Sequence, residues 1–195
     1  MKTTFALIFL VSSTIISLAA QKDTIRYLSL FEAKSIHVDS VIALKIAGKK
    51  YTAIPKEIGL YKNLQYLDLS RNKLTELPDF FENFKQLKVL KLGKNKFSNL
   101  PSVICKINSL KRLELSQNKY LTHISECIVN LENLNEIDFW DTPLAAFPDA
   151  FLKMNHLLYI DMRGVVYGPI YQQKWIKRMP WTKIEFDTPC ECMEK

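Results

Sequence analysis

Apolar residues recur along this chain with a period much longer than a helical turn or the pleat of a strand. One repeat unit places leucines, an asparagine and a proline at fixed positions, Leu64, Leu67, Leu69, Asn72, Leu74, Leu77 and Pro78. Residues 67–69 alternate within this unit and predict a short strand, because successive strand residues point to opposite faces. We expect the chain to turn out of the strand at the asparagine.

The same unit is repeated on both sides of this copy. Its last position recurs every 23 residues, apart from one interval of 24 residues, at Pro55, Pro78, Pro101, Ser125 and Pro148. The longer interval follows from one inserted residue near Tyr120, since Leu121 lies one position late. A single unit is too small to bury its own apolar residues, so the pattern predicts units that stack and share one core.

A second apolar spacing, of three residues, follows each of these positions. In one copy it comprises Ile104, Ile107 and Leu110, and equivalent residues occur in the other copies. This spacing favours a short helical or 3-10 turn that returns the chain to the next strand.

The pattern over residues 41–163 resembles the leucine-rich repeat consensus L-x-x-L-x-L-x-x-N-x-L, in the 23-residue class LxxLxLxxNxLxxLPxxIxxLxx. The two ends of the chain look similar to those of small secreted bacterial members of that family. The resemblance implies an α/β fold, a right-handed leucine-rich-repeat solenoid with a parallel concave sheet and short helical or 3-10 turns on the convex side. In this class the variable positions around the strands project onto the concave sheet.

Asparagine follows the strand in three of the units, as Asn72, Asn95 and Asn118. A buried column of amides can donate to and accept from the neighbouring backbone. Other residues replace it elsewhere, namely Lys49, Thr142 and Val165. We therefore expect the coils without asparagine to be looser or differently turned.

The sequence predicts four regions along the chain. These are a signal peptide at 1–20, an N-terminal cap helix at 21–40, the leucine-rich repeats at 41–164, and a C-terminal cap and tail at 165–195. Lys2 followed by an apolar run and small residues is typical of a secretory signal peptide, and an uncleaved signal anchor is the alternative.

Both predicted caps contain short elements. Ser29, with Glu32 three residues later, is the expected N-cap in a helix over 24–34. A helix over 170–179 and a strand over 183–187 form the expected C-terminal cap. These elements would cover the core that the first and last coils expose.

Net charge and export limit the choice of partners. The chain has a formal net charge of +7, and removal of residues 1–20 takes away one lysine. A basic protein can bind anionic glycans or acidic protein surfaces. We expect a secreted or periplasmic protein with no nucleic-acid partner and no stable membrane insertion after signal cleavage.

Four cysteines fall into two pairs. Cys105 and Cys127 lie on the helical turns of consecutive units but two positions out of register, so a disulfide and two buried thiols are both compatible with the pattern. For Cys190 and Cys192 the alternatives are an ordinary bridge, a disordered tail, a metal site or a redox dithiol.

No recognised catalytic constellation is present. The three histidines, His37, His123 and His156, lie in different units, and the chain lacks nucleophile-elbow, phosphate-loop and zinc-protease motifs. We expect neither enzyme activity nor a metal or other cofactor.

The candidate binding surface consists of variable positions beside the predicted strands. The middle units are basic there, the later units are acidic, and Tyr66, Trp140 and Tyr159 add aromatic area. Exposed aromatic and arginine side chains are enriched at binding hot spots. The predicted partner-binding residues are Tyr66, Arg71, Lys91, Lys94, Arg112, Glu114, Trp140, Asp141, Tyr159 and Arg163.

The leading hypothesis is a non-catalytic module that binds another protein through this face, with Trp140 as its anchor. The alternative is binding of a glycan or other anionic polymer through the basic middle units, at Lys88, Lys91, Lys94, Lys111 and Arg112. A solvated face whose charges pair across neighbouring strands is also compatible with the sequence, and Lys91 beside Asp68 and Glu114 fits that interpretation.

Overall fold

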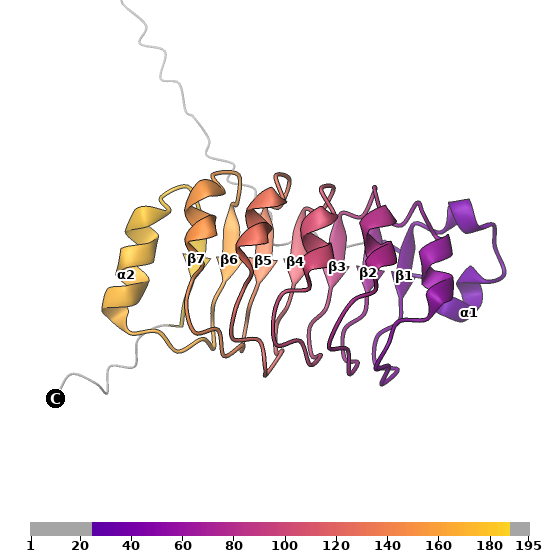
Figure 1. Ribbon diagram of the computed structural model, residues 1–195, viewed down its shortest axis with the longest axis horizontal. Helices are drawn as coiled ribbons and strands as arrows, with labels where there is room; N and C mark the ends of the chain where they lie inside the picture. The colour runs from indigo at the N-terminus through magenta and orange to yellow at the C-terminus, as the bar shows by residue number, and fades with distance from the viewer. Residues whose placement is uncertain (1–24, 188–195) are drawn as a thin grey trace, which may run out of the picture.

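The computed structural model describes residues 25–187 as a row of stacked coils, each contributing one strand (Figure 1). Seven strands within this part of the chain form a single parallel sheet in chain order. Their bounds are β1 Ala43–Lys45, β2 Tyr66–Asp68, β3 Val89–Lys91, β4 Arg112–Glu114, β5 Glu136–Asp138, β6 Tyr159–Asp161 and β7 Lys183–Glu185. The predicted solenoid with a parallel sheet is therefore confirmed. The predicted signal peptide at 1–20 and the Cys190/Cys192 pair lie outside the described residues.

The opposite side of the coils carries short 3-10 helices, which lie in front of the strands in Figure 1. They are η3 Lys56–Leu60, η4 Asp79–Asn83, η5 Ser102–Lys106, η6 Glu126–Asn130 and η7 Asp149–Lys153. Each follows the repeated proline, or Ser125, whose hydroxyl accepts a hydrogen bond from the Cys127 N–H. These helices confirm the turns that the three-residue apolar spacing predicts.

One continuous core runs between the sheet and the 3-10 helices. The middle residue of each strand from β1 to β6 is at most 1% exposed, as are Phe81, Phe84, Phe97, Phe139 and Phe151. Each coil contributes only part of this core, so its apolar residues are buried by the coils on either side.

A ladder of buried asparagines connects the first four coils. The Asn95 Nδ2 atom donates to the Leu69 and Leu92 carbonyls at 3.0 and 2.9 Å, and its Oδ1 accepts from the Leu74 N–H at 3.1 Å. Asn72 and Asn118 bond to the backbone in the same way. Each amide thus satisfies backbone groups in its own coil and in the preceding one.

The later coils turn without this ladder. The Thr142 hydroxyl donates to the Phe139 carbonyl of its own coil at 2.7 Å, and Val165 has no polar side chain to offer. The Tyr167 hydroxyl instead donates to the Leu144 carbonyl of the coil before it, at 2.8 Å. The expectation of a different turn in these coils agrees with this arrangement.

The N-terminal cap differs from the expected helix over 24–34. The α1 helix covers only Leu30–Ala33 and is followed by η2, Val38–Ser40. Ser29 and Glu32 form a reciprocal capping box, which starts the helix at Leu30 and leaves the preceding residues extended. Leu28 forms a parallel bridge with Leu44, so an extended residue together with α1 covers the first coil.

The C-terminal cap agrees with the prediction. The α2 helix, Pro169–Arg178, buries Trp175, whose ring stacks on Phe147 with centroids 4.7 Å apart. The predicted last strand is β7, which ends at Glu185 rather than Asp187. Together α2 and β7 cover the end of the core.

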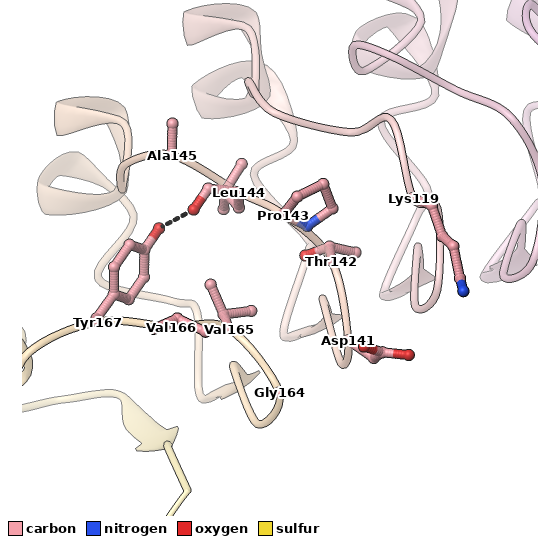
Figure 2. Close-up of a pocket in the computed structure, with 10 residues that line it drawn as sticks. All are labelled: Lys119, Asp141, Thr142, Pro143, Leu144, Ala145, Gly164, Val165, Val166 and Tyr167. Carbon is pink, nitrogen blue, oxygen red and sulfur yellow. Dashed lines mark hydrogen bonds between the residues drawn. The ribbon is translucent and has the colours of Figure 1, made fainter.

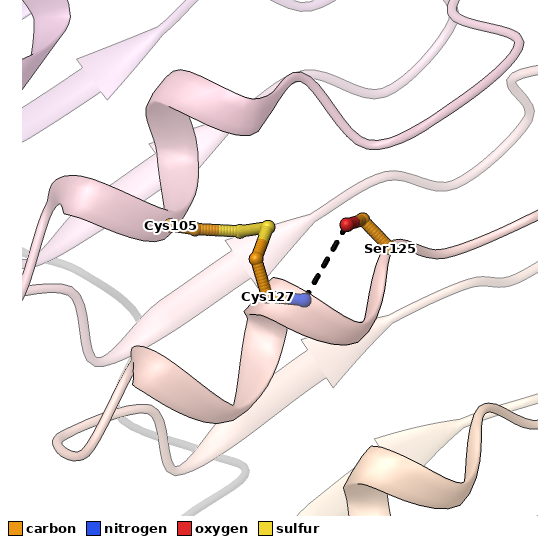
Figure 3. Close-up of a disulfide and its surroundings, with 3 residues drawn as sticks. All are labelled: Cys105, Ser125 and Cys127. Carbon is orange, nitrogen blue, oxygen red and sulfur yellow. Dashed lines mark hydrogen bonds between the residues drawn. A yellow bond between two sulfur atoms is a disulfide. The ribbon is translucent and has the colours of Figure 1, made fainter.

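Cys105 of η5 and Cys127 of η6 form a disulfide between consecutive coils (Figure 3). Their Cα atoms are 5.8 Å apart and their sequence separation is 22 residues. Closing a loop of this length stabilises a fold by about 3 kcal/mol, chiefly by restricting the unfolded chain. The bridge joins the two coils between which the extra residue near Tyr120 is inserted.

The asparagine ladder leads to a stability prediction. Replacement of Asn95 by alanine removes its side-chain hydrogen bonds and leaves buried backbone groups without partners, so the free energy of unfolding should fall by about 3 kcal/mol. Urea denaturation of the wild type and the variant measures the difference. Asn155→Ala, at an exposed turn position, is the matched control and should change stability by less than about 0.5 kcal/mol. Equal stabilities of the Asn95 variant and the wild type would show that the ladder is dispensable.

Candidate binding surface

Three parallel rows of side chains form the concave face of the sheet. We number each row by residue position, counted from the first residue of the strand. The first row contains the first residue of each strand, from Ala43 and Tyr66 to Tyr159, and the third row contains the last residue, from Lys45 to Glu185. A fifth row lies two residues beyond each strand, where a backbone hydrogen bond joins each coil to the next: Ala47, Ser70, Gly93, Ser116, Trp140 and Arg163. The middle residue of each strand points into the core.

Charges in the first part of the third row alternate in sign. Lys45 lies 3.8 Å from Asp68, and Lys91 lies 3.3 Å from Glu114. The pairing of Lys91 with Glu114 is the cross-strand arrangement that the sequence allowed. Two of the predicted partner-binding residues, Lys91 and Glu114, are therefore paired with each other.

Arginines neutralise much of the acidic part of the face. Arg112 contacts Glu114 at 3.1 Å and Glu136 at 3.6 Å. Arg163 contacts Asp161 through two nitrogen atoms, at 3.0 and 2.6 Å, and lies 3.7 Å from Glu185. Both arginines of the predicted site on this sheet are therefore held in place by acidic neighbours.

Several aspartates of the third row shape the backbone as well. Asp68, Asp138 and Asp161 each accept a hydrogen bond from the N–H two residues later, at 2.8 to 3.1 Å. These contacts fix the turn that follows the strand. Burial raises the pKa of Asp138 above its usual value, against the lowering effect of the Trp140 N–H, and the neighbouring Asp161 and Glu114 raise it further.

Trp140 is the large apolar side chain on this face that stays accessible. It is 43% exposed, although its backbone is fixed by hydrogen bonds to Asp138 and from Gln117. The preceding members of its row are small, namely Ala47, Ser70, Gly93 and Ser116. Trp140 is therefore the first large side chain in this row.

Three of the predicted site residues lie at a turn beyond the sheet. Arg71, Lys94 and Asp141 have φ angles of 56°, 56° and 52°, and Gly48, Gln117 and Gly164 share this left-handed position. At five of these six positions the backbone N–H of the left-handed residue donates to a backbone carbonyl of the next coil. A Cβ atom on Gly164 would approach Asp141 to 2.9 Å, so only glycine fits there. The structure therefore divides the ten predicted residues between the sheet face and this turn.

A depression that the sequence pattern does not predict lies beside that turn. It has a volume of about 580 Å³ and is lined by loops of the two later coils in which Thr142 and Val165 replace the asparagine, with Lys119 at its margin (Figure 2). Val166 on its wall is 97% exposed. In the sequence these two loops are marked by Thr142 and Val165, which stand at the asparagine position.

The model of a family described as a leucine-rich repeat region matches residues 33–136. The chain belongs to the leucine-rich repeat family. A leucine-rich repeat protein from Leptospira interrogans superposes with a TM-score of 0.67 at 27% identity, over 76% of this chain and 38% of that one. An internalin from Listeria monocytogenes superposes with a TM-score of 0.53 at 18% identity, over 76% of this chain and 48% of that one.

This leucine-rich repeat protein thus spans less than half the length of either structure, and the internalin shows the shared fold alone. No curated protein matches it.

Within residues 25–187, no group of three or more His, Cys, Asp or Glu side chains is arranged to hold a metal ion. No helix in that range is long and apolar enough to span a bilayer. Leucine-rich repeats commonly serve as protein-interaction modules.

The raised pKa of Asp138 predicts a pH-dependent gain in stability on neutralisation. Because the ionised form is disfavoured in the folded state, wild-type stability falls as pH rises from the ordinary pKa of an aspartate through the raised folded value. Asp138→Asn should therefore raise Tm at neutral pH, and the gain should vanish in acid where Asp138 is protonated in both states. Thermal unfolding between pH 3 and pH 8 measures this difference, with exposed Asp79→Asn as the control. A lower Tm for the Asp138 variant at pH 7 contradicts the prediction.

Proposed function

We propose that this leucine-rich repeat protein is a non-catalytic module that binds another protein through the concave face of its sheet. The observation that carries the proposal is Trp140, held on a rigid backbone yet 43% exposed. Tyr66 and Val89 of the first row, both half-buried, add apolar contact area on the same face. Rigid aromatic side chains on a fixed scaffold bind with little loss of conformational entropy.

The charge of the face indicates the kind of protein that fits. Around Trp140 the acidic residues Glu136, Asp138, Asp141 and Asp161 outnumber the nearby arginines. Arg112 and Arg163 form ion pairs with Glu136 and Asp161, so these carboxylates already have a partner when the face is free and can still accept hydrogen bonds from a bound protein. A partner with an aromatic or aliphatic side chain flanked by basic residues would complement this surface, and charge would set its orientation.

Export is the second part of the proposal. Residues 1–20 have the pattern of a secretory signal peptide, and the Cys105–Cys127 disulfide supports a secreted or periplasmic location, since disulfides persist in oxidising compartments.

Expression in a bacterium that exports through the general secretory route tests this location. The extracytoplasmic fraction should contain a protein whose mass corresponds to a chain cleaved after Ala20, with two fewer hydrogens for an intact disulfide. A protein retained at full length in the cytoplasm argues against export. A Lys2→Glu variant, which removes the positive charge before the apolar run, is expected to be processed more slowly.

The Trp140 anchor predicts a loss of partner capture without a loss of stability. Burying its exposed part removes on the order of 100 Å² from water and contributes about 2 kcal/mol, so Trp140→Ala should weaken binding about thirtyfold. Affinity capture from the native extracellular fraction, followed by titration of the captured protein, measures the change.

Leu60→Ala is the matched control for this experiment. Leu60 is 59% exposed but lies on η3, on the convex side, so its replacement should leave capture unchanged. Thermal unfolding of both variants should stay close to that of the wild type. If Trp140→Ala captures the same proteins with the same affinity as the wild type, the concave face is not the binding surface.

A further inference from the structure

A strip of unpaired cations lies along one edge of the solenoid, away from the concave rows. We call it the loop edge, formed by the left-handed turns and the segments that follow them in the first four coils. Its cations are Lys49, Lys50, Arg71, Lys73, Lys94, Lys96 and Lys119, and all seven are exposed. Among the described residues, no ion pair involves any of them.

The net charge of the chain is equal to the charge of this edge. Without these seven residues, the 27 lysines and arginines fall to 20, the same number as the 20 acidic residues. Glu76 is the one acid in the loop segments 49–55, 72–78, 95–101 and 118–125. A positive potential is therefore concentrated on the loop edge, while the paired charges of the sheet offset one another.

Four of these cations form a regular row, which we call the lysine row: Lys50, Lys73, Lys96 and Lys119. Each follows the asparagine position of its coil, and backbone hydrogen bonds from Lys73 to Tyr51 and from Lys96 to Leu74 hold neighbouring loops in register. Since parallel neighbours lie about 4.8 Å apart, the row spans roughly 15 Å. The asparagine ladder thus sets the cation spacing.

Hydroxyl side chains run beside the lysine row. Thr52, Thr75 and Ser98 lie two residues after successive lysines and are exposed. Tyr120, at the far end of the row, is an exposed aromatic residue, and no other aromatic or large aliphatic side chain of the loop edge has comparable exposure. Single-stranded nucleic acids are bound by aromatic residues interleaved with cations, and membrane surfaces by apolar side chains beside cations. Neither pattern is present here.

We propose that the loop edge binds a linear anionic polysaccharide, whose carboxylate or sulfate groups contact the lysine row and whose hydroxyls bond to the threonine and serine row. The polymer would lie along the solenoid axis, because the cations repeat from coil to coil. Binding would relieve the repulsion between neighbouring lysines. The surface is separate from the concave face, so the proposal does not depend on the protein-binding function.

The location differs from the basic middle units that the sequence indicated. Lys91 and Arg112 of that set form ion pairs with Glu114 and Glu136, and Lys88 donates to Gln65. Lys94 belongs to both sets. The structure therefore favours the loop edge over the sheet as the site for an anionic polymer.

The test is calorimetric titration of the purified protein with an eight-sugar heparin fragment, at low salt and at physiological salt. The double variant Lys73→Gln/Lys96→Gln should weaken binding at least tenfold and reduce the salt dependence of Kd. The control Lys62→Gln/Lys85→Gln removes the same charge from exposed lysines that precede, rather than follow, β2 and β3. The control should bind within about twofold of the wild type.

Further arms separate this proposal from its alternatives. Trp140→Ala should bind the fragment as the wild type does, and the loop-edge variant should not lower Tm. The proposal is overturned if both double variants weaken heparin binding equally, or if neither of them weakens it. Tighter binding to single-stranded DNA or phosphatidylglycerol vesicles than to heparin, at equal charge, overturns the polysaccharide assignment. The effect of Trp140→Ala on protein capture tests the concave face alone, so its result does not bear on polysaccharide binding by the loop edge.

Discussion

The hydrogen bonds between successive coils are the constraint on which the rest of this structure depends. Each strand has only three residues, and each coil leaves its leucines and its turn carbonyls incomplete until the next coil is added. Asn72, Asn95 and Asn118 complete the turns by bonding to the preceding coil as well as to their own. At these three positions the buried amide supplies partners to backbone groups that are shielded from water.

The end of the asparagine ladder explains several features of the later coils. The extra residue near Tyr120 comes directly after Asn118, and Thr142 replaces the asparagine in the next coil. The strands nevertheless stay in register, with Arg112 opposite Glu136, and the Cys105–Cys127 disulfide joins the convex sides of the same coils. The irregularity is confined to the loops, where the depression shown in Figure 2 opens.

Charged residues serve two different purposes in this solenoid. On the sheet they are partners of one another, and aspartates such as Asp138 also hold the turn after the strand. On the loop edge the lysines have no acidic partners in the described part of the chain. Pairing on the sheet holds the charged side chains around Trp140 in place and offsets part of their negative charge, whereas unpaired lysines create a field that extends into solvent.

The sequence by itself determined the repeat, the strand and 3-10 positions, the capping box at Ser29 and the C-terminal helix, because each depends on residues near one another in the chain. The tertiary structure decided which charges are neutralised. Lys91 and Glu114 are 23 residues apart, and the sequence left open whether Lys91 pairs with an acid. In the structure it does, whereas Lys73 has no acidic partner among the described residues. Their difference arises because stacking places an acid beside Lys91 and another lysine beside Lys73, a relation that exists only between neighbouring coils.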